Sequence, residues 1–230
     1  MNIAQRNRII VASILFMLLI AASFIFGPTV FLIGLVAIAT SFIIEFLSSV
    51  ARKEKFDWTT IWFTPLIITL LTTPTIIDQV WMVAVATGFG VFFAKAIWGG
   101  EGKYVFQPAM VGLIFIALAF PVYTLNFFDP IAQAATTITP AVTFKSNPGT
   151  VFQDFDFVEL LMGQYAGGLG TTFKLGILIL GGLLMVLRIS DWKIPLTFLG
   201  SYFVLSLVKY LSTGITFGDS FLYAGYSIFM

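Results

Sequence analysis

Three short stretches in the middle of this chain combine residue types that can bind a ligand. They cover residues 99–110, 133–140 and 167–172, and each is rich in glycine, in threonine or in both. Glycine lets the backbone approach a ligand closely, and free amides at the start of a helix attract anions. A threonine hydroxyl both donates and accepts hydrogen bonds. A simple membrane anchor needs none of these features, so the stretches predict a binding function.

The third stretch places Gly167, Gly168 and Gly170 beside Thr171 and Thr172. These residues can cradle a polar or anionic ligand, with the two hydroxyls as hydrogen-bond partners. The alternative is close packing of helices through small residues. The composition, without further context, favours packing.

The second stretch places three hydroxyls, those of Thr136, Thr137 and Thr139, before Pro140. Proline biases the residue before it away from the helical conformation, which leaves the Thr139 hydroxyl on extended, accessible backbone. The alternative is a polar loop whose threonines cap a helix. The spacing by itself favours the capped loop.

Glu45 is the one carboxylate that lies well inside an apolar run. Carboxylates within a membrane are costly and often functional, so Glu45 is a candidate for an ion or proton pathway. The alternative is an interfacial position near Arg52. For Lys95, Lys174 and Lys209, which lie near the ends of apolar runs, we expect snorkelling to the membrane surface.

The composition is that of an integral membrane protein. The mean hydropathy is +1.00, and only 10% of residues are charged, against about a quarter in soluble domains. Cysteine and histidine are absent, which excludes disulfides, thiolate iron–sulfur ligation, histidine-ligated haem and the usual zinc sites. Any electron carrier must therefore be organic. A net charge of +1 without a basic cluster gives no reason to expect a nucleic-acid partner.

The apolar runs predict an all-α polytopic protein with about eight transmembrane helices in a single membrane domain, residues 1–230. About 20 helical residues cross a bilayer core of roughly 30 Å. The third run is short and contains Pro65, so we expect it to be tilted, broken or buried in protein. The predicted spans are residues 9–26, 30–50, 58–73, 80–98, 108–124, 171–187, 194–211 and 217–230.

The distribution of lysine and arginine predicts a cytoplasmic N-terminus. Nine of the twelve then lie inside: Arg6, Arg8, Arg52, Lys53, Lys55, Lys95, Lys103, Arg188 and Lys193. Residues 125–170 become an outward-facing, extracytoplasmic polar loop. The two glycine-rich helix starts, at residues 99–102 and 167–170, then lie on opposite faces, which is a hint of an inverted repeat.

Several of these segments resemble a known family. Residues 105–112 read Val-Phe-Gln-Pro-Ala-Met-Val-Gly, residues 167–172 read Gly-Gly-Leu-Gly-Thr-Thr, and residues 191–195 read Asp-Trp-Lys-Ile-Pro. From about Phe63 onward, the chain resembles the RnfD/NqrB family. Its members are membrane subunits of the Rnf electron transport complex and of the sodium-pumping NADH:quinone oxidoreductase.

The resemblance implies a ten-helix fold built on inverted repeats and related to urea-transporter architecture. It implies an FMN attached through its phosphate to a threonine on the outer side, and it allows a second flavin such as riboflavin. Electrons would pass through these flavins in a complex that exports sodium ions or protons. No residue of this chain is expected to be catalytic on its own.

Carried onto this sequence, the flavin-bearing threonine matches Thr139, with Thr136 as the alternative attachment residue. The resemblance also implies flavin or inter-helix contacts from Gln107, Pro108 and residues 167–172. The chain departs from the family pattern at Gln133 (Asp in the family), Thr137 and Ile138 (Gly-Ala), Gln107 (Asn) and Thr171 (Glu). It is also about two helices shorter than is usual in the family.

The sequence therefore predicts a multi-pass subunit of an ion-motive, flavin-dependent electron-transfer complex in the inner membrane. Its partners would be the bilayer and the other membrane and peripheral subunits. Two alternatives stay open: a small-solute channel or transporter of urea-transporter-like architecture, and an assembly subunit that carries no cofactor.

Overall fold

The computed structural model describes residues 3–54, 56–124, 126–130, 134–137, 157–212, 218 and 223–224. The chain forms two compact units. The first comprises Met1–Thr137 with Ala166–Thr171, and the second comprises Ile138–Tyr165 with Thr172–Met230. The predicted grouping of all residues in one membrane domain stays a prediction.

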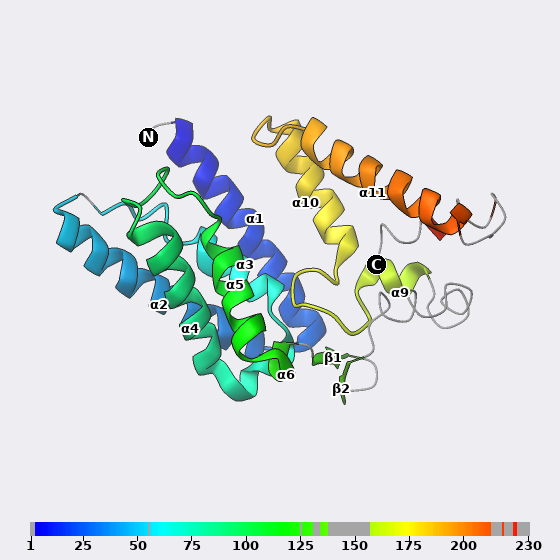
Figure 1. Cartoon of the computed structure of the whole chain (residues 1–230), viewed down its shortest axis with the longest axis horizontal. Coiled ribbons are helices and arrows are strands. Elements are labelled where there is room, and N and C mark those ends of the chain that lie inside the picture. Colours follow the sequence, from blue (N-terminus) through cyan, green and yellow to red (C-terminus); the bar gives the residue numbers. More distant parts are fainter. Residues whose placement is uncertain are drawn as a thin grey trace. The chain divides into compact units, whose positions relative to one another are not determined.

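The first unit begins with two long helices joined by a very short connection (Figure 1). α1 (Ile3–Phe26) and α2 (Thr29–Arg52) have 24 residues each. Gly27 ends α1 with φ at +93°, a left-handed conformation that glycine adopts without steric strain. Pro28 follows at the N-cap of α2. These two helices correspond to the first two predicted spans.

The next apolar segments form shorter helices. α3 (Phe63–Leu71) has only nine residues, and Pro65 lies in its first turn, where a missing amide hydrogen costs little. It occupies part of predicted span 58–73, as expected for a short or broken segment. The 3₁₀ helix η1 (Pro74–Gln79), α4 (Val80–Phe89) and the π-helix η2 (Gly90–Ala96) then run on as one apolar stretch of 23 residues.

The predicted span 108–124 is interrupted. α5 (Pro108–Ala119) ends at Phe120, which leaves the helical conformation, and α6 (Pro121–Thr124) is a single turn. The cause is Pro121, which restricts the residue before it and cannot continue the helical hydrogen bonds. A two-stranded antiparallel hairpin follows, formed by β1 (Phe127–Asp129) and β2 (Ala134–Thr136). The prediction of an all-α fold missed this hairpin.

The second unit contains α9 (Phe157–Met162), α10 (Lys174–Val186) and α11 (Lys193–Ser212). Arg188, with φ at +55°, turns the chain between the last two helices, and its amide donates to the Met185 carbonyl at 3.0 Å. α10 has 13 residues and is shorter than the predicted span 171–187. Most of the predicted span 217–230 lies outside the described residues.

The first unit has an apolar core, and much of its outer surface is apolar as well. Fully buried side chains include Ile33, Leu66, Ile68, Met82, Ile116 and Leu169. Large hydrophobic side chains such as Phe24 (86% exposed) and Leu35 (67%) point outward, as suits a protein surrounded by lipid. Four helical stretches in the described part of the chain are long and apolar enough to cross a membrane: Gln5–Phe26, Thr29–Arg52, Pro74–Ala96 and Lys193–Ser212.

Candidate functional site

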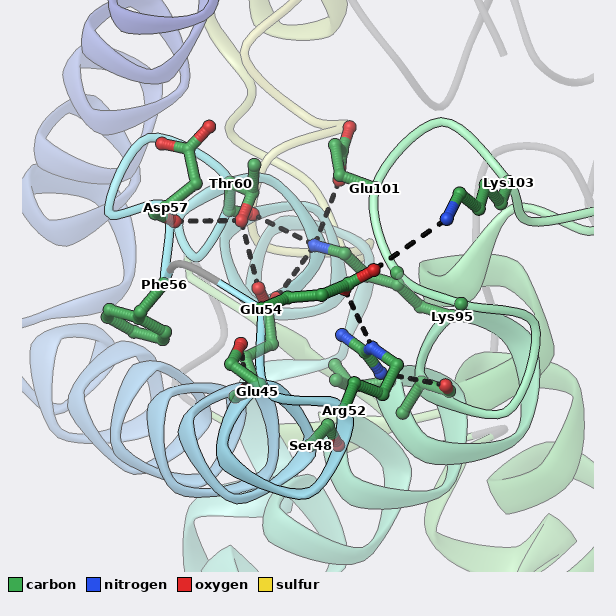
Figure 2. A pocket seen from close by; sticks show the side chains of 15 residues that line it. Glu45, Ser48, Arg52, Glu54, Phe56, Asp57, Thr60, Lys95, Glu101 and Lys103 are labelled. Atoms are coloured by element: carbon green, nitrogen blue, oxygen red, sulfur yellow. Dashed lines mark hydrogen bonds and ion pairs between the residues drawn. The ribbon is translucent and has the colours of Figure 1, made fainter.

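A buried carboxylate and a buried lysine form the centre of a polar cluster in the first unit (Figure 2). Glu45 lies on α2 and Lys95 on η2, and the atoms Oε1 and Nζ are 2.8 Å apart. The two side chains are only 9% and 5% exposed. Loss of the Lys95 charge would leave the Glu45 carboxylate buried without a cation, which is costly in a low-dielectric interior.

Further bonds hold both members of this pair. Thr60 Oγ1 donates to Glu45 Oε2 at 2.9 Å, and Ser41 Oγ donates to Glu45 Oε1 at 3.4 Å. The Lys95 ammonium also lies 2.9 Å from Glu101 Oε2 and donates to the Thr60 carbonyl at 3.4 Å. One buried cation therefore bridges two carboxylates from different parts of the chain.

Exposed charges surround this centre. Arg52 donates from Nε to Glu54 Oε2 and from Nη1 to the Ala96 carbonyl, both at 2.9 Å. Lys103 lies 3.7 Å from the other Glu54 oxygen. Figure 2 shows Glu54 between these two basic side chains. Among the described ion pairs of this unit, four basic residues face four acidic ones: Arg8, Arg52, Lys95 and Lys103 against Glu45, Glu54, Asp57 and Glu101.

The Asp57 carboxylate ties the N-terminal helix to this cluster. Arg8 lies 3.1 Å from Asp57 Oδ2, and the Thr59 amide and hydroxyl donate to Oδ1 at 2.9 and 2.7 Å. Partial burial acts to raise the pKa of Asp57, but the two bonds from Thr59 and the charge of Arg8 outweigh it. The pKa of Asp57 therefore lies below its ordinary value.

Two cavities border the cluster. One, of about 220 Å³, is lined by Glu45, Arg52, Glu54, Lys95 and Glu101 among others. The other, of about 250 Å³, shares Thr60, Lys95 and Glu101 with the first and also contacts Gln107 and Pro108. Gln107 and Pro108, for which the resemblance implies flavin or inter-helix contacts, therefore lie beside the buried ion pair. The polar region extends from Glu45 to the start of α5.

Two glycines bring α5 against the helix that carries Lys95. A Cβ atom on Gly90 would lie 2.2 Å from the Pro108 carbonyl oxygen, and one on Gly112 would lie 2.2 Å from the Ala86 carbonyl oxygen. Any side chain at either position would push the two backbones apart. Gly90 is also the first residue of the π-helix, a helix form that often occurs at functional sites.

The glycine-rich segment at residues 167–170 packs against the C-terminal end of α3. The amides of Leu169 and Gly170 donate to the carbonyls of Thr72 and Leu70 at 3.0 and 2.6 Å. They thereby satisfy carbonyls that the end of a short helix leaves without a partner. A Cβ atom on Gly170 would lie 2.6 Å from the Leu70 Cβ atom, so only glycine fits. These contacts favour the packing interpretation of the segment, because its amides are engaged within the protein.

The hairpin brings the threonine stretch next to this glycine segment. Phe128 on β1 pairs with Ala135 on β2 and also forms an antiparallel bridge with Gly167. Thr136, half-buried, pairs with Phe127 at the end of the same hairpin. The structure thus joins two of the three predicted stretches. The remaining stretch, residues 99–110, has Gln107 and Pro108 near Phe63 and Thr64 at the opposite end of α3.

The preferred attachment residue, Thr139, and the substituted motif position Gln133 lie outside the described residues. Of the remaining predicted contacts, Gly168 and Thr171 belong to the first unit, where the Thr171 hydroxyl donates to the Gly168 carbonyl at 3.2 Å. Thr172 belongs to the second unit and is fully buried, and its hydroxyl has no hydrogen-bond partner among the described residues.

The sequence pointed to Glu45 but missed its partners. The expectation that Lys95 snorkels to the membrane surface is wrong, since its side chain is buried between two carboxylates. Arg52 pairs with Glu54, although Glu45 and Arg52 line the same cavity. The ion-pathway role and the interfacial position of Glu45 both stay predictions. A signal was available: a carboxylate buried in a span needs a cation from another span, and Lys95 is a basic residue within one.

Comparisons with known proteins agree with the resemblance. A model of the NQR2, RnfD, RnfE family matches residues 2–228. The subunit named B in the Na(+)-translocating NADH-quinone reductase from Chromohalobacter salexigens is 31% identical over 199 residues, which is 84% of this chain and 46% of that protein. The subunit named D in the ion-translocating oxidoreductase complex from Buchnera aphidicola is 29% identical over 166 residues, 56% of this chain and 48% of that protein. The chain spans about half the length of these curated relatives.

Proposed function

The chain belongs to the NQR2, RnfD, RnfE family, and on that premise we propose that it is a membrane subunit of an ion-motive, flavin-dependent electron-transfer complex. The match over residues 2–228 is the observation that carries the proposal, because it covers nearly the whole chain. The relatives are named as subunits of a Na(+)-translocating NADH-quinone reductase and of an ion-translocating oxidoreductase complex. Other membrane and peripheral subunits of such a complex are the proposed partners.

The proposed redox group is an FMN bound covalently through its phosphate to Thr139, with Thr136 as the alternative. A bound flavin would supply the electron transfer. The chain has neither cysteine nor histidine, so it lacks the usual ligands for an iron–sulfur or haem carrier. The described residues fit such a group in one respect. The buried Thr172 hydroxyl lacks a partner within the described part of the chain and would be satisfied by a polar group of the cofactor.

The hairpin supports the same assignment. It places Thr136 on a strand pair that also contacts Gly167, so the threonine stretch and the glycine segment act as one local structure. The role of the glycine segment is to hold this structure against α3, since its amides at Leu169 and Gly170 already have partners. A second, non-covalent flavin is compatible with the proposal.

Glu45 is the proposed ion pathway residue. Its carboxylate is held by the Lys95 ammonium, which occupies the place that a transported sodium ion or proton would take. Lys95 already contacts Glu101 at 2.9 Å, so it can stay paired there while Glu45 accepts the ion. The transported ion could thus replace Lys95 at Glu45 without leaving either buried charge unpaired.

The proposed topology has the N-terminus in the cytoplasm, eight spans with an inverted repeat, and residues 125–170 outside. The positions of two predicted segments support it: Gly170 contacts the C-terminal end of α3, and Pro108 lies near its N-terminal end. The proposed location is the inner membrane.

A cofactor-free assembly subunit is the second candidate, favoured by the departures at Gln133 and Thr171 from the family pattern. Flavin fluorescence of the denatured chain in a gel separates the two. We expect a fluorescent band for the wild type and for Thr136→Ala, and none for Thr139→Ala. A signal that survives both substitutions would refute the attachment site. A wild-type chain without signal, from cells that attach flavins to other proteins, would favour the cofactor-free alternative.

A further inference from the structure

The second unit contains a half-buried lysine, Lys174, whose ammonium has no counter-ion among the described residues. The Nζ atom of Lys174 is buried and has no hydrogen-bond partner in the described part of the chain. It lies 4.2 Å from the centre of the Tyr165 ring. The attraction between an ammonium and an aromatic face offsets only part of the cost of removing a charge from water. The site therefore calls for a negative group.

The position of Lys174 at the start of α10 adds to this deficit. The first turn of a helix carries a partial positive charge, which favours acidic side chains and opposes basic ones. No acidic residue lies in the first turn of α10. Lys209 provides a contrast. Its Nζ atom lies 5.4 Å from the centre of the Tyr210 ring, but Lys209 is in the last turn of α11, where the helix dipole favours a cation.

Two neighbouring residues complete the site. Thr172 is 0% exposed, and its Oγ1 atom is a second buried polar atom without a described partner. The Tyr165 hydroxyl donates to the Thr172 carbonyl at 3.2 Å, so Tyr165 contacts both residues. Gly163, with φ at +85°, lets the backbone pass close to Thr172, since a Cβ atom there would lie 2.9 Å from the Thr172 carbonyl carbon. These contacts fix the backbone of Thr172, which carries the unpaired hydroxyl.

We propose that Thr172 and Lys174 form a binding site for a phosphate ester. A phosphate carries a negative charge that can pair with the Lys174 ammonium and the start of the helix. Its oxygens also accept hydrogen bonds from a hydroxyl and from amides. The phosphate belongs to the bound flavin or to the headgroup of an anionic phospholipid. The first source rests on the proposed function, whereas the second does not.

Inorganic phosphate is the probe for this site. The chain is purified in detergent from cells that cannot attach flavins, and its unfolding midpoint is measured against phosphate or chloride at matched ionic strength. A ligand that binds the folded chain raises this midpoint. We expect Lys174→Met and Thr172→Val to need at least about tenfold more phosphate for the same shift. Lys209→Met and Thr172→Ser, which keep the site's charge and hydroxyl, should respond like the wild type.

Two further measurements identify the source. Phosphorus per purified chain is determined for the wild type and for Lys174→Met, because a tightly held phospholipid would mask the response to added phosphate. If the flavin-free wild type retains phosphorus and flavin-free Lys174→Met does not, the site binds a lipid headgroup. A phosphate response that disappears when the chain carries flavin assigns it to the flavin.

The proposal is overturned if the wild type neither responds to phosphate nor retains phosphorus that Lys174→Met loses. It is also overturned if Lys174→Met and Lys209→Met lose the response equally. If Lys174→Met does not fold, Lys174→Gln and the two Thr172 variants give the same comparison. In-gel flavin fluorescence of the wild type, measured separately, shows whether the proposed function fails independently of this site.

Discussion

The Nζ atom of Lys95 lies 2.8 Å from the Oε1 atom of Glu45, although 50 residues separate them in the chain. The pair joins α2 to the π-helix that follows α4, and both side chains are buried. A buried ion pair is weak evidence for stability, since replacing it by apolar residues is often neutral. Its presence in an apolar bundle is the observation behind the proposed role of Glu45 in ion transport.

Breaking this pair from one side should destabilise the chain strongly. We expect Lys95→Met to lower the free energy of unfolding by about 3–5 kcal/mol, because it leaves the buried Glu45 carboxylate without its cation. Glu45→Gln should lower it by less, because Lys95 keeps its second partner, Glu101. The double variant Glu45→Gln with Lys95→Met should recover part of the loss. A double-mutant cycle from unfolding curves measures this coupling. Independent, additive effects of the two substitutions would contradict the pairing.

The exposed pair of Arg52 and Glu54 is the matched control. Arg52 Nε and Glu54 Oε2 are 2.9 Å apart, close to the 2.8 Å of the buried pair, but the side chains are 26% and 45% exposed. Ion pairs in contact with solvent contribute about 0–1 kcal/mol. Glu54→Gln should therefore change the unfolding free energy by no more than about 1 kcal/mol. If Glu54→Gln lowered the free energy of unfolding as much as Glu45→Gln does, burial would not explain why the two ion pairs differ in their contribution.

The helix crossing at Gly112 should not tolerate alanine. Its Cβ would lie 2.2 Å from the Ala86 carbonyl oxygen, so Gly112→Ala should cost about 1–3 kcal/mol through displaced backbone. Gly181→Ala in α10 is the control, because nothing lies within 4 Å of its Cβ position. That change should be neutral or stabilising by up to about 1 kcal/mol, since alanine favours helix. Thermal unfolding of both variants checks this, and equal effects would refute the crossing.

Acid should weaken the contact between Arg8 and Asp57. The pKa of Asp57 is lower in the folded chain than its ordinary value of 3.8, so the folded state favours the ionised form. This contribution is complete above the unfolded pKa and is lost as the pH falls through the folded pKa. Asp57→Asn should remove the contribution and flatten the decline in unfolding midpoint below about pH 5. If the unfolding midpoints of Asp57→Asn and the wild type fell identically with pH, Asp57 would make no pH-dependent contribution to stability.

The sequence predicted the long helices well because their signal is local. α1 and α2 have 24 residues each, more than the roughly 20 that cross a bilayer, and Gly27 and Pro28 mark the connection between them. The break at Phe120 and the β1–β2 hairpin were missed. Both are short features inside longer apolar or polar runs, where the composition changes little. The conformations of single residues decide where such a helix breaks or a strand forms.

The candidate site was predicted only in part, for a related reason. Glu45 was identified because a carboxylate inside an apolar run is rare, but its partners Lys95 and Glu101 depend on helix packing that no local pattern encodes. The role of the glycine segment in binding stays a prediction. That its amides bond to the end of α3 follows from tertiary contacts between distant residues, Gly170 and Leu70 among them.

The flavin attachment is tested most directly by mass spectrometry of the peptide that contains residues 133–140. The chain should be purified from cells that attach flavins to other proteins. We expect a fragment carrying the mass of FMN as a phosphoester on Thr139, and no such mass in Thr139→Ala. A peptide recovered entirely without flavin from the wild-type chain would contradict the proposed role as a flavin-bearing subunit.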